Sequence, residues 1–178
     1  MSVLPSNIAE LIDASKALAL RPIWDSDSDA RNFWFIAPLV IKEVVVGGFE
    51  LRARVSKHFV DRDAMMQLEF SLTGRQRIEL WRCQWRPFET HTNKAWGPDG
   101  YELARFRQRS HHHPFHENWM ITEKRLRAGS LPAALPIDPD PSTLSKFIAF
   151  CGQEFRIRNI ELVSLPQATP DFFWTADD

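Results

Sequence analysis

The chain has 178 residues, of which 44% are hydrophobic and 25% are charged, and this size and composition are typical of one globular domain. Lysine and arginine total 22 against 23 aspartate and glutamate residues, which excludes a protein that binds nucleic acid through bulk charge alone. The two cysteines, Cys83 and Cys151, are too few for a disulfide scaffold or a four-cysteine zinc site.

The sequence gives no sign of export or membrane insertion. Polar residues interrupt the N-terminal segment, so the pattern of a signal peptide is missing. The longest apolar run, 33–41, is far shorter than the ~20 residues that span a bilayer. We therefore expect a cytoplasmic protein that does not associate with a membrane and whose cysteines are reduced.

The first predicted element is a helix over 6–20, because apolar residues recur there at spacings of three and four until Pro22. Segments rich in Val, Ile, Phe and Trp follow, with turn signals such as Gly47-Gly48 among them. These segments predict an antiparallel meander of four strands, over 31–40, 43–56, 65–72 and 77–85.

The C-terminal half contains a second predicted helix, over 142–151 with Ser142 as its cap, and a final strand over 157–165. The predicted fold class is therefore α+β: an N-terminal helix, an antiparallel β-meander of four or more strands, a C-terminal helix and a final strand. We expect a single domain over 1–165 and a loosely attached tail over 166–178. The aromatic residues of this tail would dock on an apolar groove or on a partner.

Positive charge is concentrated between Arg75 and Arg127, where eleven Lys and Arg residues face six Asp and Glu residues, a local balance of +5. Within this region Arg105, Arg107 and Arg109 surround Phe106, and such interleaving of cations with an aromatic is typical of grooves that bind nucleic acid. The alternative is that the three arginines form the solvated face of a strand.

Histidines form the second cluster in this region, where His111, His112, His113 and His116 lie twenty or more residues after His91. In an extended segment, His111 and His113 share one face. Such a pair, joined by a third imidazole, suits acid–base catalysis near neutral pH or the binding of zinc or nickel. The candidate metal ligands are His91, His111, His113 and His116, and a His-rich surface loop without a catalytic role is a third interpretation.

Four short motifs carry a family resemblance: a strand with Arg82 near its end, His91-Thr-Asn93, Asp99-Gly100, and His111-His-His113. They resemble the signature of a family of small uncharacterised bacterial and prophage proteins, similar in layout to the TumE-type toxins of toxin–antitoxin systems. The resemblance implies a cytoplasmic, mobile-element or defence-related protein. Its partner would be a cognate antitoxin or another protein encoded by a neighbouring gene.

The residues favour a toxin-like, metal-independent ribonuclease without a cofactor, because the RNA 2′-hydroxyl supplies its own nucleophile once a base takes its proton. His91 and His113 would be the base and the acid, and His111 would orient one of them. The RNA would be held by Arg82, Asn93, Lys94, Arg105, Arg107 and Arg109. The alternatives are a non-catalytic interaction protein of a mobile-element or defence locus and a His-based metal-binding protein.

Overall fold

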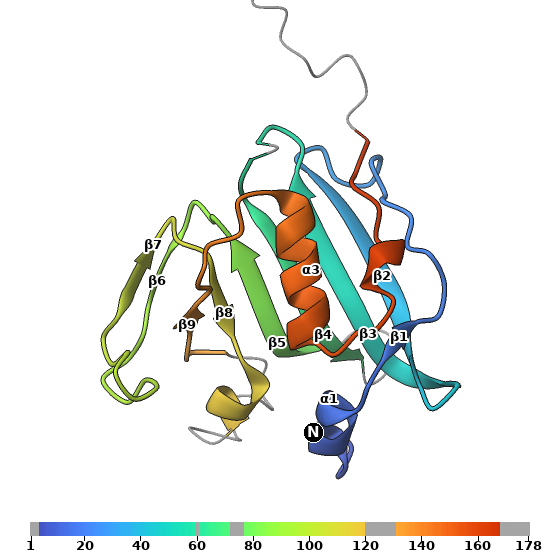
Figure 1. The fold of residues 1–178 in the computed structure, drawn as a ribbon, viewed down its shortest axis with the longest axis horizontal. Coiled ribbons are helices and arrows are strands. Elements are labelled where there is room, and N and C mark those ends of the chain that lie inside the picture. Colours follow the sequence, from blue (N-terminus) through green and yellow to red (C-terminus); the bar gives the residue numbers. More distant parts are fainter. Residues whose placement is uncertain (1–3, 60, 72–76, 120–130, 168–178) are drawn as a thin grey trace, which may run out of the picture.

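A computed structural model describes residues 4–59, 61–71, 77–119 and 131–167. Over these ranges the chain forms an α+β fold with a seven-stranded antiparallel sheet in the order β1-β2-β3-β4-β5-β8-β9 and a separate hairpin, β6-β7 (Figure 1). The element bounds are α1 Ile8–Asp13, β1 Ala17–Leu18, β2 Asn32–Ile41, β3 Val44–Ser56, β4 Ala64–Ser71, β5 Arg77–Trp85, β6 Thr90–Thr92, β7 Arg105–Arg107, β8 His111–His113, β9 Leu135–Pro136, α3 Leu144–Glu154 and the 3-10 helix η1 Ile160–Leu162.

The predicted four-stranded meander is confirmed, since β2 to β5 pair in sequence as antiparallel neighbours. The β2–β3 turn lies at Lys42 and Glu43, which both adopt positive φ angles, and not at Gly47-Gly48 as predicted. Gly48 lies inside β3 with a φ of 79°, and a Cβ there would collide with the backbone oxygen of Ser71. Glycine is therefore required at this position by a close approach of two strands.

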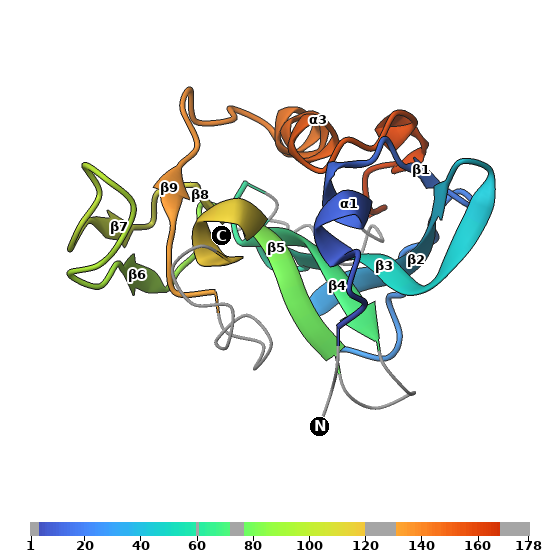
Figure 2. The same ribbon diagram turned by 90° about the horizontal axis from the view of Figure 1, so that it is seen from below.

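The hydrophobic core lies between the sheet and α3, which crosses one face of the strands (Figure 1). Trp85 stacks on Phe147 of α3 with ring centroids 6.2 Å apart, and Trp81 meets Phe155 edge-on at 5.9 Å. Side chains alternate between the two faces of each strand, so Cys83 joins the two tryptophans in the core, whereas Arg82 and Gln84 point away from α3. Seen from below, α3 lies on one side of the sheet and the β6–β7 hairpin extends beyond its edge (Figure 2).

The predicted N-terminal helix is correct in type but too long. Helix α1 ends at Asp13, and Ala17–Leu18 pair with β2 as an edge strand. Lys16, which is fully buried, donates from Nζ to the carbonyl oxygens of Ile12 and Ala14. These long-range and capping hydrogen bonds outweigh the local helical pattern.

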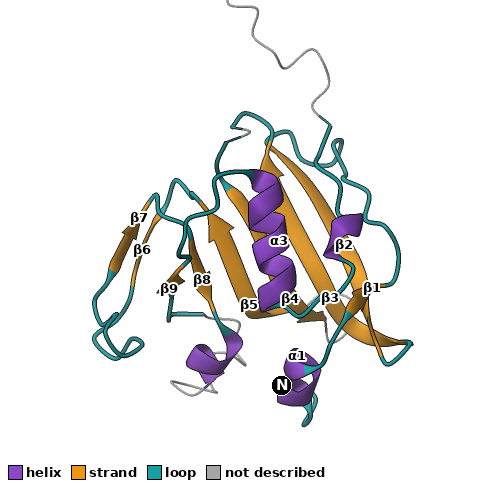
Figure 3. Cartoon of the chain, in the orientation of Figure 1, coloured by secondary structure: helices purple, strands orange, loops and turns teal. Residues whose placement is uncertain are grey.

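The predicted C-terminal helix is confirmed, although its cap is Thr143, whose side chain accepts from the Lys146 amide, and not Ser142. The predicted final strand is wrong: Ile157 makes an isolated parallel bridge to Lys16, and η1 follows (Figure 3). The aromatic part of the predicted tail lies outside the described residues. Within those residues, no helix is long and apolar enough to cross a membrane.

Candidate functional site

Three imidazoles from two strands meet beside the sheet edge. The ring centroid of His91, in β6, lies 5.6 Å from that of His111 and 4.6 Å from that of His113, and the two β8 rings are 5.2 Å apart. Strand β8 pairs with β5 in a register that places His113 opposite Arg82. The structure thus brings together the three histidines that sequence analysis proposed as catalytic.

Phe106 is the side chain that connects the hairpin to this cluster. It is buried in β7, and its ring centroid lies 6.1 Å from that of His91 and 5.2 Å from that of His111. Arg105 and Arg107, its neighbours in β7, are exposed. The alternation that points the two arginines outward therefore directs Phe106 against the imidazoles.

The hydrogen bonds fix which ring nitrogen carries the proton in each neutral imidazole. His91 Nε2 lies 3.0 Å from Asn93 Oδ1 and His111 Nδ1 lies 2.8 Å from the Arg109 carbonyl oxygen, so both nitrogens donate. The partner of His113 Nε2 is Arg82 Nη2 at 3.4 Å, which can only donate. The lone pairs of His111 and His113 therefore lie on Nε2, whereas His91 also makes a hydrogen bond to the backbone of Pro132.

Burial and the charge of Arg82 keep the cluster neutral. Burial is the main cause that lowers the pKa of His91. The hydrogen bond to Asn93 raises this pKa, and the charge of Arg82 lowers it further. Burial also lowers the pKa of His111 to about 4 and that of His113 well below its usual value. The Arg82 charge acts in the same direction on both rings. At neutral pH the cluster can accept a proton but holds none to give.

Exposure distinguishes the three rings. His111 and His113 are 1% and 0% exposed, whereas His91 is partly exposed. A group that reacts with a macromolecular substrate must be reached by it, so His91 is the member of the cluster suited to direct contact.

Asn93, which we predicted to help hold RNA, does not lie where it could do so. The residue is 1% exposed, and its Nδ2 donates to the carbonyl oxygens of Tyr101 and Ala134. Its Oδ1 accepts from the Ala134 amide and from His91 Nε2. All four hydrogen-bonding positions are occupied, so Asn93 orients His91 and ties the loop after β6 to the segment before β9.

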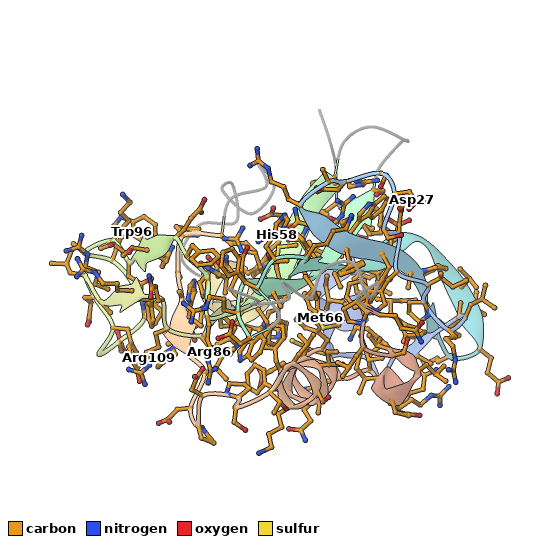
Figure 4. All side chains as sticks on the ribbon, turned by 90° about the horizontal axis from the view of Figure 1, so that it is seen from above. Asp27, His58, Met66, Arg86, Trp96 and Arg109 are labelled. Carbon is orange, nitrogen blue, oxygen red and sulfur yellow. The ribbon has the colours of Figure 1, made fainter. Side chains whose placement is uncertain are left out.

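The predicted substrate-binding cations lie around the cluster rather than in it. Arg82 is beside His113, whereas the side chains of Lys94, Arg105, Arg107 and Arg109 are exposed. Figure 4 shows Arg109 and Trp96 at the hairpin end of the molecule and Asp27 at the opposite end. The cationic hairpin end and the acidic loop that contains Asp27 are therefore separated by the width of the sheet.

The predicted four-histidine metal site does not form. His116 lies apart from the cluster, with Nε2 2.9 Å from Asp13 Oδ1 and its ring beside Trp81, on the α3 side of β5. Across the described ranges, no group of three or more His, Cys, Asp or Glu side chains is placed to hold a metal ion. The zinc or nickel interpretation is therefore not supported.

His112 points to the opposite side of β8 from the cluster, toward α3. Its Nδ1 lies 3.4 Å from Glu154 Oε2, and its ring packs edge-on against Phe150. Burial lowers the pKa of His112, but hydrogen bonds to Cys83 and Glu154 outweigh it and raise that pKa to about 9. Cys83 and Cys151 are both free and buried, as expected for cysteines without a disulfide.

Comparisons with protein families, with curated proteins and with solved structures found no match for this chain. The resemblance to prophage proteins and TumE-type toxins stays a prediction that rests on its four short motifs.

Proposed function

We propose that this protein binds RNA and cleaves it without a metal ion, with His91 as the general base and Arg82 as the cation that holds the phosphate. The observation that carries the proposal is the gathering of three neutral imidazoles around one guanidinium group whose charge lowers the pKa of all three.

The reaction needs little beyond this arrangement. The His91 imidazole takes the proton of a 2′-hydroxyl, the 2′ oxygen forms a bond to the adjacent phosphorus, and the bond from phosphorus to the 5′ oxygen breaks. Water supplies the proton for the leaving 5′ oxygen, and His91 returns its own proton to solvent. A phosphate beside Arg82 offsets the guanidinium charge, which raises the proton affinity of His91 when substrate is bound.

This scheme changes the role that sequence analysis gave to His113 and keeps the orienting role of His111. A buried His113 with a strongly lowered pKa is not suited to act as the acid at neutral pH. We assign His111 and His113 as positioning residues that pack against His91, while Lys94, Arg105 and Arg107 supply exposed positive charge at the same end of the molecule.

Cleavage of a single-stranded RNA by purified protein in the presence of EDTA tests the proposal. We expect a product that ends in a 2′,3′-cyclic phosphate, and a loss of at least ~100-fold in rate for His91→Ala, which is the low end of what a general base contributes. His116→Ala is the matched control, because this imidazole lies outside the cluster, and its rate should equal that of the wild type. Full activity of His91→Ala would overturn the assignment.

The burial of His111 and His113 favours a second candidate, a non-catalytic protein that binds RNA or a protein from a neighbouring gene, such as an antitoxin. In this case the imidazoles stabilise the hairpin and do no chemistry. Wild-type protein that binds RNA but leaves it intact over hours, at any pH between about 5 and 8, would favour this candidate over the ribonuclease.

A further inference from the structure

Two adjacent rows of side chains cross five strands on the face of the sheet opposite α3 and end at the histidine cluster. One row consists of Trp34, Arg54, Met65, Gln84 and His111. The next consists of Ile36, Arg52, Gln67, Arg82 and His113. Directly opposed residues of an antiparallel sheet point to the same side, so each row is continuous over about 19 Å, four strand spacings.

The arginines of this surface, which we call the row face, are held in place by carboxylates. Arg52 Nε lies 2.9 Å from Glu69 Oε1, Arg54 Nη2 lies 3.0 Å from an Asp63 oxygen, and Arg82 Nη1 lies 3.1 Å from Glu79 Oε2. Their side chains are between 24% and 34% exposed, so each guanidinium group is fixed yet reachable. Fixed planar cations of this kind bind a planar ligand with little loss of side-chain entropy.

Trp34 marks the far end of the row face. Its ring lies 5.8 Å from the guanidinium carbon of Arg52, and both residues line a hollow of about 400 Å³ together with Arg54, Met65 and Arg77. An aromatic ring beside a guanidinium group in a hollow is the arrangement that stacks unpaired nucleobases in proteins that bind single strands.

Several polar atoms of the two rows are buried and have no hydrogen-bond partner among the described residues. They are the acceptor Gln67 Oε1 and the donor Arg82 Nε in the middle of one row, and His111 Nε2 and His113 Nδ1 at the cluster end of the two rows. Gln67 is 5% exposed and His111 is 1% exposed. Buried polar groups are normally paired, so these atoms mark the row face as a polar surface with unmet donors and acceptors.

The charge of the row face favours bases over phosphates as the groups it contacts. Arg52 and Arg54 are each paired with a carboxylate, and Asp29 also lines the hollow near Trp34, whereas Arg82, at the cluster end, is the arginine that we assign to the reacting phosphate. Exposed cations also gather at the hairpin end, where Figure 4 shows Arg109. The row face therefore suits base stacking and base edges, and the hairpin end suits the phosphate that reacts.

We propose that the row face binds single-stranded RNA, with one unpaired base stacked at Trp34 and the strand running across β3, β4 and β5 to His91. This inference rests on the proposed function and assigns the substrate of that site as unpaired RNA. It also predicts a weak dependence of binding on salt, because few phosphates lose their counterions on a surface whose arginines are already paired.

Fluorescence anisotropy with a labelled RNA of about eight nucleotides tests this proposal, since single-strand sites cover about 4–16 nucleotides. The RNA carries 2′-O-methyl groups throughout, so that no cleavage can occur. We expect Trp34→Ala to weaken binding on the order of ten-fold, as loss of one stacked base does, and Trp34→Phe to keep most of the affinity. Gln84→Met, which keeps the side-chain length but removes the amide from the row, should weaken binding several-fold.

Arg158→Ala is the control for these variants and should bind as the wild type does, because Arg158 is exposed and follows α3, away from the row face. Thermal unfolding of each variant shows that it is folded. Equal affinity of wild type, Trp34→Ala and Gln84→Met would overturn the proposal, as would equal affinity for a duplex of the same sequence. If binding depends on Trp34 but unmodified RNA is not cleaved, the row face is supported and only the ribonuclease assignment fails.

Discussion

Asn93 accepts a hydrogen bond from the imidazole of His91 through an oxygen atom that also serves a second donor. Asn93 Oδ1 accepts from His91 Nε2 at 3.0 Å and from the Ala134 amide at 2.9 Å. The imidazole of His91 is therefore oriented by a side chain that also joins two segments distant in the sequence. A change at Asn93 alters both the site and the stability of the fold around it.

Asn93→Ala should lower the free energy of unfolding by about 2 kcal/mol or more. The substitution leaves the amide and the carbonyl oxygen of Ala134 without their side-chain partner, and a buried unpaired group costs about 1–3 kcal/mol, whereas the Tyr101 carbonyl oxygen still accepts from the Ala104 amide. Urea unfolding followed by circular dichroism measures the loss. Lys94→Ala, at the exposed neighbouring position, should change stability by less than about 0.5 kcal/mol. An unchanged urea midpoint for Asn93→Ala would contradict this account.

Much of the sheet could be predicted because the strands β2 to β5 contain runs of β-branched and aromatic residues long enough to show their period. The shortened N-terminal helix could not, since the chain after it pairs with β2 and Lys16 exchanges backbone hydrogen bonds with Arg156 and Arg158. Local sequence carries no information on such long-range partners.

The candidate site was found in part because its histidines are close in sequence, and the period of two placed His111 and His113 on one face. The row face was missed. Arg52 and Arg54 alternate with buried residues in β3, which was a usable signal. Only the register of three strand pairs, however, aligns Arg52 and Gln67 with Arg82 and His113. Register depends on tertiary packing and turn geometry.

The histidine cluster should make the protein less stable in acid. The pKa of His111 is about 4 in the folded chain and about 6.5 when unfolded, so below pH 6.5 the unfolded state binds a proton that the folded state excludes. Stability is therefore unaffected above pH 6.5 and falls between pH 6.5 and 4, by up to about 3 kcal/mol for this one residue.

Urea unfolding at several pH values between 7.5 and 4 measures this acid dependence. His111→Gln provides the comparison, since an amide can donate to the Arg109 carbonyl oxygen but does not titrate. The variant should lose less stability on acidification than the wild type. Parallel curves for the two proteins would show that His111 is not responsible.

The Glu154 carboxylate should stabilise the protonated form of His112. The pKa of His112 is raised to about 9, so this residue contributes stability that is fully present below pH 6.5 and is lost as the pH rises through 9. Glu154→Gln removes the carboxylate 3.4 Å from His112 Nδ1 and should lower that pKa by at least about one unit. Titration of the His112 ring followed by NMR measures the shift. Glu161→Gln is the control, because it changes an exposed carboxylate on η1 and should leave the pKa of His112 unchanged. A His112 pKa that stays near 9 in Glu154→Gln would show that the ion pair with Glu154 does not raise it.

Gly152→Ala in α3 should destabilise the protein, although alanine normally stabilises a helix interior by about 1 kcal/mol relative to glycine. A Cβ at this position would overlap the Ile160 side chain, whose Cβ would lie only 2.7 Å away, and overpacking of this kind costs about 1–3 kcal/mol. Gly47→Ala is the matched control, because a Cβ there meets nothing within 4 Å, and its stability should equal or slightly exceed that of the wild type. The double variant Gly152→Ala with Ile160→Ala should be more stable than the sum of the two single changes predicts, because the smaller side chain removes the overlap. A thermal midpoint for Gly152→Ala above that of the wild type would show that η1 does not pack against α3 as described.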